Sequence, residues 1–318
     1  MGAQVSGRGQ VAIAASAVGY GVGTALSVVA LHGLRPADLL AIELVCSAAV
    51  LLVFAAATGR LRREGAGRAL VQGAVLPGLS FLVGDLGLAR TSATSGALLL
   101  SVDAIATVLL SAIFLRERVG RVVGAALALG TAGTILVALN APDDGLAAIA
   151  GSETLGNLLV LASVLGGAAY VVWSRRTAQP ADEGVGRTAW QFLGATLTVL
   201  PFVLGSWWTG GSRITTAEPH QLAAAAAVLL CGLGALLAFN IGIGTVSASR
   251  AGLLYTLQPL AGALTAVALL GEPVVAGQAF GAALILACLV VLTRAEPTDH
   301  PTPTPDADAD ADAVQTTR

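Results

Sequence analysis

Polar side chains inside apolar segments are the groups of this chain that could bind a small molecule or move a proton. Several of them occur twice, because residues 81–119 align with residues 236–274 when the sequence is shifted by 155 positions. Polar groups are rare in long apolar segments, so a shared register of polar positions indicates a duplicated unit. The matching pairs are Asp85 with Asn240, Ser101 with Thr256, and Asp103 with Gln258. The first pair lies near segment ends, where helix capping is the alternative interpretation.

Asp103 is the polar residue whose position most requires an explanation, because it lies about halfway along the apolar segment 93–115. A carboxylate at the centre of a bilayer costs at least ~2.5–3.5 kcal/mol on insertion scales. We expect Asp103 to face a cavity as a substrate or proton site; the alternative is a neutral carboxyl group hydrogen-bonded to a neighbouring helix. Its repeat mate Gln258 precedes Pro259, which breaks a helical hydrogen bond. The carbonyl group freed in this way either lines a binding cavity or belongs to a packing kink.

Four further polar or aromatic residues are candidates for the same site, together with Glu43. Glu43 lies in the second apolar segment and is either functional or extends toward water, and Gln191, 148 residues further on, is its expected counterpart. Tyr20 and Tyr170 stand beside glycines in the first segment of each half, and Tyr255 lies in the ninth segment. Small residues let helices approach closely, so each tyrosine either packs at a helix contact or touches a substrate.

The composition predicts the environment of these residues. The chain has 318 residues, of which 55% are hydrophobic and 11% charged, and its mean hydropathy is +0.81. A soluble domain carries roughly 25% charged residues, so this chain has too little charge to cover a water-facing surface. Its apolar runs have the length of about 20 residues that a membrane helix needs. The chain is therefore predicted to be an all-α polytopic membrane protein.

Other kinds of chemistry find no support in the sequence. It contains no nucleotide-binding loop, catalytic triad or metal-ligand spacing, and its three histidines are dispersed. The three cysteines, Cys46, Cys231 and Cys288, lie in separate apolar runs and are expected to be small buried side chains. We therefore expect no enzyme activity, no metal and no cofactor.

Ten membrane spans are predicted, arranged as two halves of five. Residues 1–9 form an N-terminal lead, 10–140 the first five-helix repeat, 141–154 a connecting loop, 155–293 the second repeat, and 294–318 a disordered acidic tail. The predicted spans are Gln10–Leu31, Asp38–Ala57, Ala69–Leu88, Ala93–Leu115, Gly120–Leu139, Leu155–Trp173, Thr188–Trp208, Gln221–Ile241, Ala251–Leu270 and Val274–Leu292.

The arginines predict the orientation. All 17 basic residues are Arg, and with the N-terminus in the cytoplasm 14 of them fall on cytoplasmic segments and 3 on outer loops. This bias places both termini in the cytoplasm. Because five is odd, the second half then enters the membrane upside down. The loop 116–121 accordingly carries three arginines, whereas its repeat mate 271–276 carries none. Inverted repeats of this kind are typical of secondary transporters.

Short motifs recur at the ends of these spans. They are Ala89-Arg90-Thr91-Ser92-Ala93, Phe114-Leu115-Arg116-Glu117-Arg118, Gly156-Asn157 through Tyr170–Arg176, Leu269-Leu270-Gly271-Glu272-Pro273 and Gln278-Ala279-Phe280-Gly281. In their order, doubling and spacing these motifs resemble the drug/metabolite transporter superfamily, specifically the ten-helix EamA-type permeases. The resemblance covers roughly residues 10–293. It implies two inverted five-helix repeats in the inner membrane that move small metabolites, often outward.

The function predicted is secondary transport of small metabolites or drugs, with export as the expected direction, by alternating access between the two repeats. A gradient would drive it, with protons passing through Asp103 or Glu43 as one route. The expected partners are a small-molecule substrate and the lipid bilayer of the cell membrane, and no nucleic acid. The alternatives are a membrane-embedded enzyme or lipid-handling protein, and a non-transporting structural or sensory partner.

Overall fold

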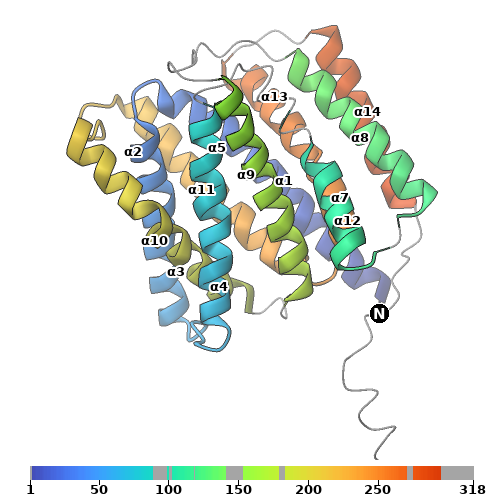
Figure 1. The fold of residues 1–318 in the computed structure, drawn as a ribbon, viewed down its shortest axis with the longest axis horizontal. Helices are drawn as coiled ribbons and strands as arrows, with labels where there is room; N and C mark the ends of the chain where they lie inside the picture. The colour runs from blue at the N-terminus through green and yellow to red at the C-terminus, as the bar shows by residue number, and fades with distance from the viewer. Residues whose placement is uncertain are drawn as a thin grey trace, which may run out of the picture.

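The chain forms a helical bundle in a computed structural model, and no strand occurs among the residues that the structure describes (Figure 1). These residues are 2–88, 99, 102–117, 119–140, 153–178, 183–270 and 275–294. Most of the predicted connecting loop, the acidic tail after residue 294 and the motif at 89–93 lie outside them. The first helix begins at Gly2, so it continues through the predicted N-terminal lead.

Among the described residues the first half contains seven α-helices, and two of its spans are divided by π-helical turns. The elements of this half, in which η marks a π-helical turn, are α1 (Gly2–Leu31), α2 (Pro36–Leu40), η1 (Ala41–Val45), α3 (Cys46–Ala57), α4 (Ala66–Gly73), η2 (Ala74–Leu79), α5 (Ser80–Leu88), α7 (Asp103–Phe114) and α8 (Arg121–Leu139). The second half contains α9 (Glu153–Arg176), α10 (Gly184–Gly210), α11 (Pro219–Gly242), α12 (Ala248–Leu254), α13 (Leu257–Leu270) and α14 (Ala276–Arg294).

Seven helical stretches among the described residues are long and apolar enough to cross a membrane, and one of them, Ala248–Leu269, comprises both α12 and α13. Three shorter apolar helices correspond to the predicted fourth, fifth and tenth spans: Asp103–Phe114, Arg121–Val137 and Ala276–Leu292. The protein is therefore a multi-pass helical membrane protein, and the count of ten complete spans stays a prediction.

Two predicted spans are not the continuous helices that the sequence suggested. In the fourth, Val102 lies in a turn and α7 begins at Asp103, so this carboxyl group stands at a helix start rather than in mid-helix. In the ninth, Tyr255 and Thr256 separate α12 from α13. The reason is local, because Pro259 lies in the first turn of α13, where its missing N–H removes no helical bond. The proline thus begins a helix instead of kinking one.

Helices at equivalent positions of the two halves pack against each other in antiparallel fashion. In the pair α8 and α14, Gly130 faces Cys288 and Gly133 faces Gly281. Helices α7 and α12 belong to the equivalent fourth and ninth spans, and they meet where the Ser111 and Ser249 hydroxyl groups are 2.6 Å apart. Antiparallel contact of repeat mates is the geometry of a two-fold axis lying in the membrane plane. The α8–α14 pair forms one edge of the bundle (Figure 1).

The first helix of each half packs into the other half, which locks the halves together. Helix α1 packs against α11 and α13, and α9 packs against α5 and α7. These contacts are close because glycines form them: a Cβ atom on Gly87 would lie 2.8 Å from the Val160 backbone nitrogen of α9. Glycines therefore allow close helix packing between the two halves, as the sequence predicted.

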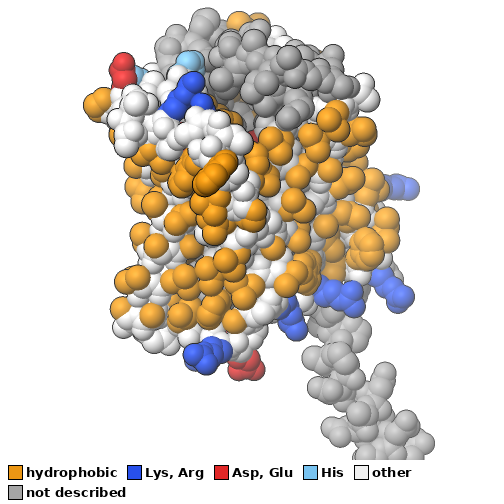
Figure 2. Space-filling view, turned by 60° about the vertical axis from the view of Figure 1, so that its left-hand side comes forward, with side chains coloured by type: hydrophobic (Ala, Val, Ile, Leu, Met, Phe, Trp, Pro, Cys, Tyr) orange, Lys and Arg blue, Asp and Glu red, His pale blue; other side chains and the backbone are white. Residues whose placement is uncertain are grey.

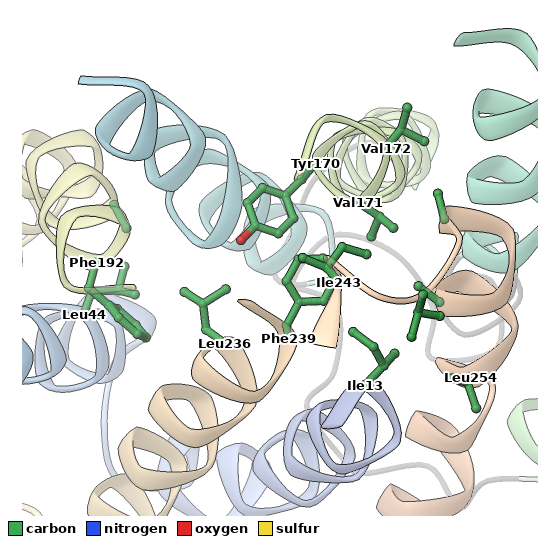
Figure 3. Packing of buried hydrophobic residues seen from close by; sticks show 14 of the residues in the cluster. Ile13, Leu44, Tyr170, Val171, Val172, Phe192, Leu236, Phe239, Ile243 and Leu254 are labelled. Carbon is green, nitrogen blue, oxygen red and sulfur yellow. The ribbon is translucent and has the colours of Figure 1, made fainter. Parts of the chain in front are cut away.

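Apolar residues fill the interior and also cover the outside. Tyr170, Phe192 and Phe239 are among the large buried side chains that pack between helices (Figure 3). Figure 2 shows hydrophobic side chains over the middle of the visible face and most charged side chains toward its ends. Val53, Ile113 and Leu230 are each about two-thirds exposed. A belt of exposed apolar side chains is suited to contact with lipid.

Candidate functional site

The three tyrosines of the chain lie together where the halves meet. Tyr20 of α1 and Tyr255, between α12 and α13, have ring centroids 6.3 Å apart. Tyr20 also makes an edge contact with Phe81 of α5 at 6.1 Å. Phe239 of α11 continues the cluster, since its ring lies 6.3 Å from that of Tyr255 and 5.4 Å from that of Tyr170. Such spacings are typical of interacting aromatic rings.

A hydrogen bond joins the two halves at this cluster. The hydroxyl groups of Ser16 and Tyr255 are 2.7 Å apart, and either can be the donor. Tyr170 reaches out of α9 toward Leu236 and Phe239 and is almost completely buried (Figure 3). Its hydroxyl group has no hydrogen-bond partner among the described residues. The structure thus brings all three sequence-predicted tyrosines into one place, while their contact with a substrate remains a prediction.

Two carboxyl groups of the first half border the aromatic cluster. Glu43 lies in the π-helical turn η1, and its side chain packs on Gly232 of α11. Asp85 of α5 is exposed and lies near Glu43. Glu43 also lies near Tyr20. Irregular turns inside membrane helices occur where backbone is buried in protein or lines a cavity, and many are functional.

Asp103 borders the cluster from the start of α7. A Cβ atom on Gly167 of α9 would lie 3.7 Å from its Oδ1 atom, so the carboxyl group stands against a helix of the second half. Asp103 also lies near Tyr255. Within the described part of the chain, no hydrogen bond or ion pair is found for the carboxyl groups of Glu43, Asp85 or Asp103. We call these three acids, the three tyrosines and Phe81 the central cluster.

The two amide side chains predicted for the site, Gln258 and Gln191, lie in different parts of the protein. Gln258 lies in the first turn of α13, where its backbone carbonyl stands against Gly21 of α1, and it is partly buried beside Tyr255. Gln191 of α10 is fully buried in a second polar group, which the sequence did not predict. Its Nε2 atom donates to Gln72 Oε1 at 3.3 Å, and its Oε1 atom accepts from Asn240 at 2.6 Å.

Arg187 belongs to this second polar group, although its sequence position suggested a topology signal in a cytoplasmic loop. It is only 7% exposed because α10 begins before it, at Gly184. Its Nη2 atom donates to Gln72 Oε1 at 3.1 Å. The sequence signal was its place directly before an apolar span, where one more helical turn draws the side chain into the protein.

Asp38 is a second polar residue that sequence reasoning passed over. It is completely buried near the start of its span and receives four hydrogen bonds. Trp207 Nε1 and Ser212 Oγ donate to its Oδ1 atom at 2.8 and 2.7 Å, and the backbone N–H groups of Arg35 and Arg213 donate to Oδ2. A fully satisfied carboxylate that ties helix ends together has a structural role.

Comparisons with known proteins agree with the duplicated architecture. The model of the EamA-like transporter family matches residues 7–139 and again residues 154–294. A solved structure described only as "Crystal structure of protein" has a TM-score of 0.71 and 21% sequence identity; the match covers 92% of this chain and 99% of that chain. At this identity the likeness establishes the fold. No curated protein matches the chain.

Proposed function

The chain belongs to the EamA-like transporter family, and on this basis we propose that it exports small metabolites by alternating access between its two halves. The proposed arrangement has ten spans in two inverted repeats, with both termini in the cytoplasm, in the cytoplasmic membrane. Membership in a family of transporters favours transport over the alternative of a membrane-embedded enzyme or lipid-handling protein.

The observation that carries the proposal is the composition of the central cluster from both halves. Tyr20 of the first half contacts Tyr255 of the second, and Asp103 stands against Gly167 of the second half. Any rotation of one half against the other therefore changes the surroundings of these groups. A substrate site at the interface of inverted repeats is the arrangement that alternating access requires.

The chemistry of the central cluster favours a particular kind of substrate. Its members offer aromatic rings and carboxyl groups, and no arginine is among them. Rings and carboxyl groups together suit a small molecule that has an apolar part and a cationic or hydrogen-bond-donating group. Carboxyl groups inside membrane spans are the groups that relay protons in transporters, so the neighbouring Glu43 and Asp85 also suit proton exchange.

The proposal is tested by flux. Metabolites inside and outside cells with and without the protein are compared first, and the substrate found is then measured in proteoliposomes. We expect release that depends on the protein and on a proton gradient, and we expect Asp103→Asn to reduce it at least tenfold with unchanged membrane levels. Equal flux by Asp103→Asn at every pH would exclude the proton role.

Two further outcomes would exclude transport itself. One is a new product formed by the purified protein without a second compartment, which would identify an enzyme. The other is the absence of flux for every candidate substrate, with correct folding demonstrated, which would favour a structural or sensory partner.

A further inference from the structure

A second site lies away from the central cluster, at the N-terminal end of α10. A pocket of about 160 Å³ opens there between the turn that joins α3 to α4 and the first turns of α10. Its polar lining consists of Arg60, Arg62, Glu64, Glu183 and Arg187, and Trp190 supplies an aromatic wall. The pocket is therefore rich in arginine, in contrast to the acidic central cluster.

Arg187 is the unusual member of this lining. Its side chain is more than nine-tenths buried, and its Nη1 atom has no hydrogen-bond partner among the described residues. None of the ion pairs found in the described part of the chain involves it. Buried arginines are almost always paired, because an uncompensated charge in a protein interior is costly. Arg187 thus lines the pocket with a positive charge for which the described residues supply no carboxylate partner, and an anion from outside the chain could supply one.

The neighbouring charged side chains that the structure describes do not compensate the charge of Arg187. Glu183 is paired with Arg62, at 3.0 Å between Oε1 and Nη1. The Arg62 carbonyl oxygen accepts a hydrogen bond of 2.8 Å from Trp190 Nε1, which holds the turn against α10. Arg60 and Glu64 are exposed and hydrated. Among the described residues that line the pocket one positive charge is therefore in excess, and it belongs to Arg187.

Helix α10 adds to the preference for anions. It has 27 residues, and Glu183 at its N-cap makes no capping hydrogen bond from its side chain. The first N–H groups of the helix consequently receive no side-chain acceptor from the N-cap. Free N–H groups and the positive end of the helix dipole are the features that bind phosphate at helix starts.

We propose that this pocket binds a phosphate-type oxyanion, with Arg187 as the principal charge and the start of α10 as the second source of donors. Guanidinium and phosphate groups match in geometry and form paired charge-assisted hydrogen bonds. The anion comes either from a phospholipid headgroup or from free phosphate. A tryptophan and arginines at helix ends are typical of the membrane interface, where anionic headgroups lie. The test of this proposal does not depend on the proposed transport function, because anion binding is measured without any transport.

The test uses the full-length protein in nanodiscs. Inorganic phosphate is titrated in phosphatidylcholine discs against sodium chloride of equal ionic strength, and separate discs contain phosphatidylglycerol. We expect the midpoint of thermal unfolding to rise with one or both probes. A rise with phosphate in phosphatidylcholine identifies a free anion, and a rise with phosphatidylglycerol alone identifies a headgroup. Either result supports an oxyanion site.

Variants attribute the effect to the pocket. Arg187→Gln should weaken binding about tenfold or more, because it removes charge-assisted hydrogen bonds, and Arg187→Lys should retain part of it. Ala69→Leu fills the pocket from α4 while leaving the charge in place, and it should weaken binding equally. Arg176→Gln, at an exposed arginine outside the pocket, is the matched control. The proposal is overturned if neither probe stabilises the protein above chloride, or if both pocket variants bind like the wild type.

Discussion

Glu117 provides the sharpest test of how the two halves hold together. Its Oε1 atom accepts a hydrogen bond from the Ala248 N–H group at 2.9 Å, and Oε2 accepts from the N–H and hydroxyl groups of Ser249 at 2.9 and 2.6 Å. One carboxylate thereby caps the start of α12 from the end of α7. We predict that Glu117→Ala weakens the contact between α7 and α12.

The size of the effect follows from these three bonds. Hydrogen bonds to a charged group contribute ~1.5–3 kcal/mol each, and water compensates much of the loss at a partly exposed site. A net loss of ~2 kcal/mol is therefore expected, which changes a two-state population by about 30-fold. Ser111 and Ser249 still bond each other in the variant, so the protein should remain folded.

The assay is the rate at which a membrane-impermeant thiol reagent modifies Thr107→Cys in a protein without its native cysteines. Thr107 is completely buried against Gly252, between α7 and α12. The rate should rise by about the same 30-fold factor, whereas Glu64→Ala, at an exposed acid, should leave it unchanged. A rate that is unaltered in folded Glu117→Ala protein would refute the reasoning.

Three more predictions concern stability, measured as the free energy of unfolding in detergent. Asp38→Ala leaves four donors without an acceptor and should lower the free energy of unfolding by about 3 kcal/mol. Asp85→Ala removes no hydrogen bond found among the described residues and should lower it little. Equal losses of stability in the two variants would contradict the structural role assigned to Asp38. Tyr255→Phe loses its bond to the first helix and should cost about 1 kcal/mol, and a change well above that would indicate a larger role for the hydroxyl group. Gly133→Leu places a Cβ atom 2.7 Å from a carbonyl oxygen of α14 and should prevent normal folding, whereas Gly124→Leu, with open space around it, should be tolerated.

Periodicity and polar matching predicted much of the fold from the sequence. Helix bounds such as Pro36–Ala57 and Pro219–Gly242 lie within a few residues of the predicted spans. This agreement follows from the bilayer, which requires about 20 apolar residues for each crossing. The tyrosines were found because aromatic hydroxyl groups beside glycines mark places where helices meet.

The breaks before Asp103 and after Leu254 could not be predicted, because both lie inside apolar segments as long as those of a continuous membrane helix. Only tertiary contacts provide partners for the backbone groups left free there. The burial of Arg187 was missed for a related reason. Arginine counts predict topology, but they do not say which side chain turns inward, and that depends on where Gln72 lies in the folded protein.

The glycine contact between α8 and α14 joins two helices that hold the same place in their repeats. Two separate copies of one five-helix chain, inserted in opposite directions, would meet in this way around a two-fold axis. Such a pair must carry every carboxyl group twice. Fusion into one chain removes that constraint, and here each acid of the central cluster has a neutral amide as its expected repeat mate: Glu43 with Gln191, Asp85 with Asn240, and Asp103 with Gln258. The joined molecule can thus be symmetric in its backbone and one-sided in its charge.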